Sequence, residues 1–270
     1  MIFRNNTLDL DTWNLEQGTT EWLRARAGVV TASVADVILM DNKRSPFPDD
    51  VKITALAGRG NNMVIFNGQE FTGNKAQCID WVRDQLPMIF PEMKKGYLYS
   101  LAGQICTGLV SDSIPFKQAE WGHENEPYAR DAYEAKTMEI VEQCGFIYKD
   151  ESLRCGISPD GIIDLKKGLE IKNPFTTEIH IATAIAGEIK PEYITQCQYS
   201  MWVTGFDEWM FCSYDHRMRG RAENRICIIP QKRDTEMMKK FDDKVPAFLE
   251  ELDSIVSKFG FKFGDQWRDL

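Results

Sequence analysis

Two carboxylates and one ammonium group, on Asp160, Glu170 and Lys172, have the types and the spacing that phosphoryl chemistry requires. Two close carboxylates repel each other unless a cation lies between them, and hard oxygen ligands suit Mg²⁺. The main-chain carbonyl of Ile171 is a candidate third ligand from the same stretch. Beside such a metal, the Lys172 amine could hold or deprotonate a water for in-line attack at a phosphorus atom, while the metal stabilises the developing charge.

A β-hairpin has to position these groups. Two short apolar runs flank a polar turn, which we expect to end at Gly168, and they predict two strands. Glu170 and Lys172 lie two apart on the second strand and therefore share a face, while Ile171 points into the core. Asp160 enters at the start of the first strand, so each strand brings a carboxylate to one end of the sheet. The alternative is a solvated strand face that carries an ordinary charge pair.

Length, composition and charge predict a globular protein of one domain. At 270 residues the chain can bury a substantial core, and its 43% hydrophobic and 27% charged content is ordinary for a soluble protein. We find no internal repeat, low-complexity tract or clear linker. The net charge of −9 argues against general coating of a polyanion. It does not exclude a DNA enzyme, because a metal site needs carboxylates and basic groups can be concentrated in one channel.

The cysteines and the absence of long apolar runs predict a cytoplasmic protein. The cysteines number seven, which is odd, and no CxxC pair occurs, so a disulfide scaffold and a zinc knuckle are both disfavoured. We expect buried thiols in a reducing cytoplasm. The first residues lack the apolar core of a signal peptide, and no apolar run is long enough to span a bilayer.

A phosphate clamp is one interpretation of the basic residues near the N-terminus. Arg24 and Arg26 precede Thr31–Ser33, which we expect to cap a helix that continues to Leu39. A guanidinium binds phosphate with two hydrogen bonds, and a helix N-terminus adds backbone donors. The alternative is a solvated helix flank.

Two further helices carry polar residues that could reach the same site. The helix expected at Lys117–Lys136 bears Glu126, with Arg130 one turn further on. One interpretation is an exposed charge pair, which contributes roughly a few tenths of a kcal/mol to stability. The alternative is that one glutamate of the helix turns inward to the metal site. On the helix expected at Tyr193–Val203, Gln196 can point away from the apolar face.

The remaining elements predict a mixed α/β arrangement. We expect strands at Glu139–Tyr148, Trp209–Tyr214 and Arg225–Ile229. A basic loop between the last two strands contains His216, Arg217, Arg219 and Arg221. This loop is either ordinary solvated charge or a contact with a nucleic-acid backbone. A long apolar stripe predicts a final helix from Asp234 to Lys258, with a kink or a break at Pro246.

Several stretches together resemble the phage lambda exonuclease group, also called the YqaJ-type viral recombinases, a family of PD-(D/E)xK nucleases. The matching stretches are Trp22–Ser33, Trp121–Glu134, Asp150–Thr176, Tyr193–Thr204 and Phe259–Arg268. Ser158-Pro159-Asp160-Gly161 is a close match. The resemblance covers most of the chain outside about residues 43–88. We therefore expect a single nuclease domain over residues 1–270 that carries an insertion at about 43–88.

The resemblance implies a restriction-endonuclease-like α/β core, with helices on both faces of a mixed central sheet. It implies a 5′→3′ exonuclease that degrades one strand of linear duplex DNA and leaves a 3′ overhang for recombination by strand annealing. Metal binding falls on Asp160, Glu170, the Ile171 carbonyl and Glu126, with two Mg²⁺ ions that Mn²⁺ can replace. Lys172 matches the catalytic lysine, and Gln196 matches a glutamine position near the same site.

The resemblance also implies how the DNA end is bound. Arg26 matches an arginine that takes the 5′-phosphate, and Ser33 and Ser158 match positions near the terminal phosphates. The family forms ring-shaped trimers and works with a single-strand annealing protein, so we expect a homotrimer with a basic bore inside an acidic shell. A phage or prophage origin, in the cytoplasm of a bacterial host, is expected on the same basis.

Two alternative functions stay open. A related nuclease of the same fold could act as an endonuclease. A DNA-end-binding scaffold with a vestigial site would cut nothing. The complete set of Asp160, Glu170 and Lys172 argues against the scaffold, because an inactive relative has no chemical need for all three.

Overall fold

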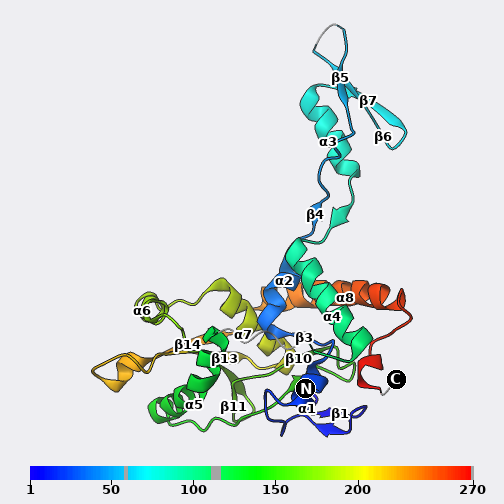
Figure 1. The fold of residues 1–270 in the computed structure, drawn as a ribbon. Coiled ribbons are helices and arrows are strands. Elements are labelled where there is room, and N and C mark those ends of the chain that lie inside the picture. Colours follow the sequence, from blue (N-terminus) through cyan, green and yellow to red (C-terminus); the bar gives the residue numbers. More distant parts are fainter. Residues whose placement is uncertain (58–59, 111–116, 269–270) are drawn as a thin grey trace. The chain divides into compact units, whose positions relative to one another are not determined.

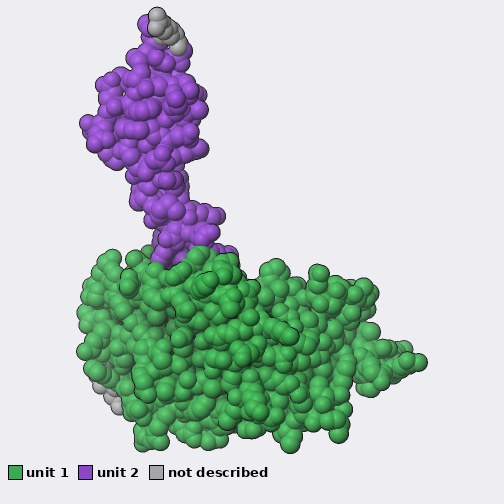
Figure 2. Space-filling view, turned by 180° about the vertical axis from the view of Figure 1, so that it is seen from behind, with its two compact units in different colours: residues 1–39, 96–270 green, residues 40–95 purple. Residues whose placement is uncertain are grey.

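The chain divides into two compact units. The structure, a computed structural model, describes residues 1–57, 60–110 and 117–268 (Figure 1). Unit 1 is Met1–Leu39 with Gly96–Leu270, and unit 2 is Met40–Lys95 (Figure 2). Each unit has a hydrophobic cluster of its own. The single nuclease domain with an insertion at about 43–88 stays a prediction, and residues 58–59 of that range lie outside the described residues.

Unit 1 contains most of the helices and the larger sheets. Its helices are α1 (Thr20–Arg26), η1 (Ala32–Val34), α2 (Ala35–Leu39), α5 (Lys117–Thr137), α6 (Thr177–Ala186), α7 (Pro191–Thr204), η2 (Ala222–Arg225), α8 (Thr235–Ser257) and η3 (Asp265–Trp267), and α4 (Glu92–Thr107) contains the boundary with unit 2. Its strands are β1 (Arg4–Asn5), β2 (Leu10–Asp11), β3 (Val30–Thr31), β9 (Ile147–Tyr148), β10 (Cys155–Ile157), β11 (Gly161–Ile163), β12 (Lys167–Lys172), β13 (Glu208–Tyr214) and β14 (Ile226–Lys232).

Unit 2 is a small sheet covered by a helix. Its elements are β4 (Lys43–Arg44), β5 (Ile53–Ala55), β6 (Asn62–Phe66), β7 (Gln69–Gly73), α3 (Lys75–Gln85) and β8 (Met88–Ile89). Strands β5, β6 and β7 form an antiparallel sheet. Helix α3 begins at a capping box between Asn74 and Gln77 and buries Cys78 and Val82 against Val64.

The central sheet of unit 1 has the order β11-β12-β13-β14. Strands β12 and β13 are parallel, whereas β11–β12 and β13–β14 are antiparallel pairs. The predicted mixed sheet in an α/β fold is therefore confirmed. In the parallel pair, Glu170 lies opposite Phe211 and Lys172 lies opposite Ser213.

Helices α5 and α7 cover opposite faces of this sheet (Figure 1). Ile171 is buried in a cluster that includes Tyr133 of α5. Glu170, the preceding residue on β12, points to the other face, where Gln196 of α7 donates a hydrogen bond to it. The alternation of side chains along a strand thus separates the core-forming residue from the polar one, as the hairpin pattern predicts.

A second sheet, of order β3-β10-β9, connects the N-terminal segment to the central hairpin. Strand β3 pairs in parallel with β10, with Val30 opposite Cys155. Strand β10 ends at Ile157, and the chain passes through Ser158 to Asp160 before β11 begins. The segment that follows α1 is therefore attached to the strand that leads into the first carboxylate.

The hairpin turn lies earlier than we predicted. The turn is formed by Asp164, Leu165 and Lys166, and the first two adopt left-handed backbone angles with φ of 52° and 53°. Gly168 is part of β12 and pairs with Ile162. The ring of Trp209 covers Gly168, and a Cβ added there would overlap that ring. This glycine is needed for close packing, not for the turn.

The strand predicted at Glu139–Tyr148 is mostly wrong. Only Ile147–Tyr148 forms a strand, and Glu142 makes an isolated bridge to Ile162. The amides of Gly145 and Phe146 donate to carbonyls of the N-terminal arm, so these backbone groups are satisfied outside a strand ladder.

One predicted helix start, and the break that was one of the two alternatives predicted at Pro246, also differ from the structure. Thr31 belongs to β3 and makes no side-chain cap, and α2 begins only at Ala35. The final helix has no break at Pro246, because α8 runs from Thr235 to Ser257 with the proline inside it. Five aromatic and aliphatic residues of α8 at helical spacing are buried on one side, and this packing offsets the hydrogen bond that proline cannot donate.

Membrane insertion finds no support in the described residues, since none of their helices combines the length and the apolar character that a bilayer span requires.

Replacement of Gly168 tests the close packing at the hairpin. Gly168→Ala should lower the free energy of unfolding by about 1–3 kcal/mol, the usual cost of overpacking. Urea denaturation followed by circular dichroism measures this. Gly103→Ala is the matched control, because a Cβ at this helical glycine meets nothing within 4 Å. That variant should be as stable as the wild type or up to about 1 kcal/mol more stable. Equal stability of Gly168→Ala and wild type would contradict the packing argument.

Candidate active site

The hairpin brings Asp160, Glu170 and Lys172 together at one end of the central sheet. The Asp160 Oδ2 atom accepts a hydrogen bond of 2.5 Å from the backbone amide of Ile171. The Lys172 Nζ atom donates to Glu170 Oε1 at 2.5 Å. Glu170 is only 4% exposed, so its carboxylate is held by protein donors in place of bulk water.

Helix α5 adds a third carboxylate through Glu126. Arg130, one turn further along α5, donates from Nη2 to Glu126 Oε1 at 2.6 Å. The Nε atom of the same guanidinium donates to the backbone carbonyl of Asp160 at 3.2 Å. Arg130 is 9% exposed. Because its guanidinium bonds to both Glu126 and Asp160, it attaches α5 to the start of β11.

Helix α7 contributes a polar and an aromatic side chain. The Gln196 Nε2 atom donates to Glu170 Oε1 at 2.7 Å. The Lys172 ammonium lies 5.1 Å from the ring centroid of Tyr193, one turn before Gln196. The same Glu170 oxygen thus accepts from Lys172 and from Gln196, which fixes the orientation of its carboxylate.

The charges at this site shift the ionisation of their neighbours. Burial, followed by the negative charges of Glu170 and Glu126, raises the pKa of Asp160 well above its ordinary value of 3.8. Burial also raises the pKa of Glu126, although Arg130 opposes this change. Burial alone would lower the pKa of Lys172, but the carboxylates of Glu170 and Asp160 outweigh it and raise that pKa. The site therefore holds more negative charge than its own cations stabilise.

The oxygen atoms at this site suit a hard divalent cation. Asp160, Glu170 and Glu126 each keep one carboxylate oxygen that accepts no hydrogen bond from the described residues. Among residues 1–57, 60–110 and 117–268, no three His, Cys, Asp or Glu side chains lie close enough together to hold one ion as they stand. The donor types and the repulsion between the carboxylates fit such an ion, and small side-chain rotations would have to bring the oxygens together.

A separate cavity of about 420 Å³ lies around Arg26, at the end of α1. Its walls include Trp22, Ser33 and Tyr97. The guanidinium of Arg26 lies over the ring of Trp22, 4.0 Å from its centroid, and makes no ion pair with a carboxylate of the described residues. Burial lowers the pKa of Arg26 to about 10, so the group is still cationic at neutral pH. Arg24, by contrast, is exposed.

Trp22 connects this cavity to the carboxylate site. Its indole Nε1 donates to Ser158 Oγ and to the carbonyl of Gly145, both at 3.0 Å. Ser158 stands two residues before Asp160. The structure therefore brings Arg26 and Ser33 into one cavity and places Ser158 on the path between that cavity and the carboxylates.

Three side chains at these sites escaped the sequence analysis. Arg130 was recognised only as a charge pair, and nothing in the spacing showed that it also reaches the Asp160 carbonyl. The four-residue spacing of Trp22 and Arg26 on a short helix could have indicated their stacking. Tyr193 lies one turn before Gln196, and this spacing could have placed it beside Lys172.

Comparison with known proteins identifies relatives of this chain. Residues 96–207 match the family described as the YqaJ-like viral recombinase domain. A putative uncharacterised protein from Escherichia coli K12, ExoD, is 44% identical over 80 residues, which are 30% of this chain and 88% of that protein.

Solved structures with the same fold are exonucleases. An alkaline exonuclease from Laribacter hongkongensis is 27% identical, with a TM-score of 0.65 over 90% of this chain and 96% of that one. The same exonuclease in complex with dAMP is 28% identical, with a TM-score of 0.64 over 89% and 96% of the two chains. A phage-related exonuclease from Haemophilus somnus shares the fold at 14% identity, with a TM-score of 0.53 over 86% and 96%.

The raised pKa of Asp160 predicts that this residue destabilises the metal-free protein. A carboxyl group with a raised folded-state pKa binds its proton more tightly when folded. The free energy of unfolding therefore falls as the pH rises from the ordinary pKa of 3.8 through the folded-state pKa. In EDTA at pH 8, Asp160→Asn should be more stable than the wild type by about 1 kcal/mol or more.

The measurement is urea denaturation of both proteins in EDTA at pH 4 and at pH 8. The difference should shrink at pH 4, because the folded wild type then keeps its Asp160 carboxyl protonated and avoids most of the cost of ionising it. An Asp160→Asn protein that is less stable than the wild type at pH 8 would show that the site does not repel this charge.

Proposed function

We propose that this chain, which belongs to the YqaJ-like viral recombinase family, degrades one strand of linear duplex DNA from the 5′ end and leaves a 3′ overhang for recombination by strand annealing. The chain is a nuclease of the lambda exonuclease type, as its family and its solved relatives indicate. The observation that supports the 5′ polarity is the guanidinium of Arg26, which makes no ion pair among the described residues and lies in a cavity that Trp22 and Ser158 connect to Asp160.

The residues that would hold metal are those with free carboxylate oxygens. Asp160, Glu170 and Glu126 each offer one, and Ile171 offers its carbonyl. The amide of Ile171 donates to Asp160, and the N–H and C=O groups of one strand residue point to the same side, so this carbonyl faces Asp160 as well. Bound Mg²⁺, for which Mn²⁺ could substitute, would supply charge stabilisation and a more acidic water. We propose two such ions.

Lys172 acts in this proposal as a cation that holds an anionic oxygen. Its raised pKa keeps it protonated at neutral pH in the metal-free protein, which disfavours a role as proton acceptor. Its distance of 2.5 Å to Glu170 Oε1 shows that it can reach the oxygen ligands of the site. Gln196 shares that oxygen and limits the rotation of the Glu170 carboxylate.

Arg26 would bind the terminal 5′-phosphate. A terminal phosphate carries more negative charge than an internal one, and a planar guanidinium can bind it with two parallel hydrogen bonds. The contact with the Trp22 ring, 4.0 Å from its centroid, restricts the position of the Arg26 guanidinium. Ser33 lines the same cavity. Ser158 accepts a hydrogen bond from Trp22 and would lie beside the DNA strand as it passes from Arg26 to the carboxylates.

The partners expected from the family complete the proposal. A homotrimeric ring around duplex DNA would reconcile the net charge of −9 with DNA binding, if basic groups line the bore. A single-strand annealing protein would receive the 3′ overhang. A location in the cytoplasm of a bacterial host and a phage or prophage origin belong to the same proposal.

A test of the reaction compares linear and closed circular duplex DNA, with Mg²⁺ and with EDTA. The wild type should degrade only the linear form and only with the metal. Lys172→Ala should lower the rate by about 10²-fold or more, because it removes a positioned charge at the reacting centre. Its binding to DNA in Ca²⁺ should be unchanged. Nicking of the circle would favour an endonuclease, and cleavage of neither form would favour a scaffold.

A test of the polarity uses paired duplexes that differ only in the 5′-phosphate. The wild type should digest the phosphorylated duplex faster. Arg26→Ala should reduce that preference by about tenfold or more, since hydrogen bonds to charged groups contribute about 1.5–3 kcal/mol. Arg26→Lys should recover only part of it.

Arg24→Ala is the matched control, because Arg24 is exposed two residues away on the same helix. It should leave the ratio of the two initial rates nearly unchanged. If Arg26→Ala leaves this ratio as it is in the wild type, the phosphate is bound elsewhere.

A further inference from the structure

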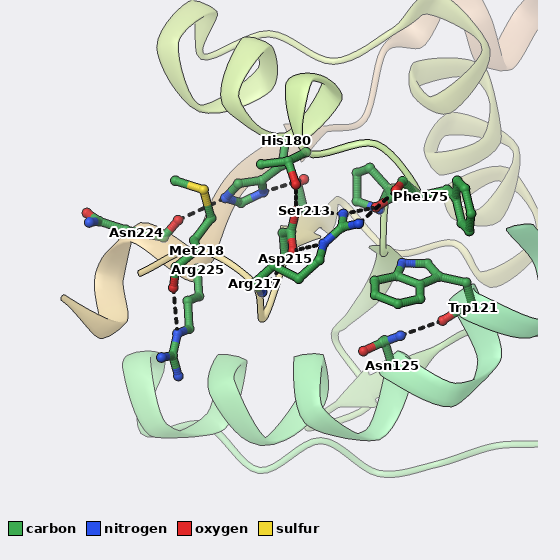
Figure 3. A network of polar contacts seen from close by, with 12 residues as sticks. Trp121, Asn125, Phe175, His180, Ser213, Asp215, Arg217, Met218, Asn224 and Arg225 are labelled. Carbon is green, nitrogen blue, oxygen red and sulfur yellow. Dashed lines mark hydrogen bonds and ion pairs between the residues drawn. The ribbon is translucent and has the colours of Figure 1, made fainter. Parts of the chain in front are cut away.

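A network of polar contacts around Asp215 and Arg217 links the segments that follow β12 and β13 (Figure 3). Its centre is Asp215, the first residue after β13, which is 2% exposed. The Asp215 carboxylate accepts hydrogen bonds from the Nε and Nη2 atoms of Arg217, both at 2.8 Å. It also accepts one of 2.7 Å from the hydroxyl of Thr177, at the start of α6. A buried carboxylate with this many donors is a rigid anchor for the guanidinium.

The same guanidinium also contacts the segment that follows β12, the strand that carries Glu170 and Lys172. Arg217 donates from Nη1 to the carbonyl of Phe175 at 2.9 Å and from Nη2 to the carbonyl of Pro174 at 3.0 Å. The parallel ladder between β12 and β13 ends at the pair Lys172 and Ser213. Beyond that pair, the hydrogen bonds of Arg217 connect the segment after β12 with the segment after β13.

Helix α5 is fastened to the same segment. The Arg217 guanidinium lies 4.6 Å from the ring centroid of Trp121, and Trp121 packs edge-on against Phe175 at 6.0 Å. The side-chain Nδ2 atom of Asn173 donates to the carbonyl of Gly122 at 3.0 Å. Figure 3 shows Trp121 and Phe175 beside the Arg217 side chain. The N-terminal half of α5 is thus attached to residues that directly follow Lys172.

These contacts determine the separation of two parts of the site. Glu126 stands on α5 little more than one turn after Trp121, and Lys172 is the residue before Asn173. In the part of the chain that the structure describes, neither Asp215 nor Arg217 makes a hydrogen bond or ion pair with Asp160, Glu170 or Glu126. Their effect can only pass through the backbone segments that they hold.

We propose that Asp215 and Arg217 are positioning residues that hold Glu126 of α5 in register with Glu170 and Lys172 of β12, an inference that rests on the proposed nuclease function. This replaces one alternative for the basic loop, in which Arg217 would contact the backbone of a nucleic acid. The Nε, Nη1 and Nη2 atoms of Arg217 all donate to groups of the protein. Among the described residues, the side chains of Arg219 and Arg221 make no hydrogen bond or ion pair.

The test compares Arg217→Gln and Asp215→Asn with Arg219→Gln, a matched control from the same loop. Steady-state digestion of 5′-phosphorylated duplex gives kcat and KM separately, and calorimetric titration with Mn²⁺ gives metal affinity in the absence of DNA. Both positioning variants should lower kcat by about tenfold or more, because a small misplacement near reacting groups is costly. Their Mn²⁺ affinity should fall by about tenfold, and KM should change less than about twofold. Arg219→Gln should leave kcat and Mn²⁺ affinity unchanged.

A direct contact of Arg217 with DNA would give the opposite pattern. KM would rise and its salt dependence would weaken, while kcat and Mn²⁺ affinity would equal those of the wild type. That result would overturn the proposal. Arg217→Lys keeps the charge but cannot reproduce the double contact with Asp215, so its kcat should lie between those of the wild type and Arg217→Gln. It also serves as the test variant if Arg217→Gln does not fold.

The Mn²⁺ titration separates failure of this inference from failure of the proposed function. A wild type that binds Mn²⁺ but cuts no DNA would refute the nuclease function. Weakened Mn²⁺ binding in Arg217→Gln and Asp215→Asn would then still support the positioning role. Unchanged Mn²⁺ affinity in both variants would refute that role, whether or not the wild type is active.

Discussion

Electrostatic repulsion among three carboxylates is the interaction on which the rest of the site depends. Asp160, Glu170 and Glu126 come from the start of β11, from β12 and from α5. Besides burial, the charges of Glu170 and Glu126 raise the pKa of Asp160, and the charge of Glu170 raises that of Glu126. Such an arrangement costs folding free energy unless cations offset it. Lys172 and Arg130 supply part of that charge from within the chain. The remaining imbalance is the physical reason to expect a divalent cation, and such a cation would stabilise an anionic transition state.

The two cations of the site differ in how they are placed. Lys172 is on the same strand face as Glu170, so local strand geometry is enough to pair them. Arg130 links Glu126 to the backbone of Asp160 and therefore spans two elements. If a metal replaces part of this charge, Lys172 becomes free to move toward substrate, whereas Arg130 keeps α5 attached to β11. A division of this kind would let one cation act on the substrate while the other preserves the geometry.

The cavity around Arg26 and the carboxylate site are joined by a short chain of contacts. Strand β3 pairs with β10, and β10 leads through Ser158 to Asp160. Trp22 stacks on Arg26 and donates to Ser158. The distance between a bound terminal phosphate and the carboxylates would therefore be nearly fixed, and a fixed distance is what an enzyme needs to remove nucleotides from an end in uniform steps. Asp215 and Arg217 would in a similar way hold α5 in a fixed position relative to β12.

The sequence by itself determined the local features of this protein. The spacing of Glu170 and Lys172 placed them on one face, the apolar runs predicted the hairpin, and the residue patterns identified the family. Tertiary structure decided what depends on neighbours distant in sequence. Gly168 looked like a turn residue but is required under Trp209, and Pro246 looked like a break but lies within a helix held by its buried face. Arg130 and Arg217 looked like surface charges, yet each donates to carbonyls of another segment. Periodicity along a chain reports which face a side chain occupies, but only the packed fold decides which distant backbone groups it will meet there.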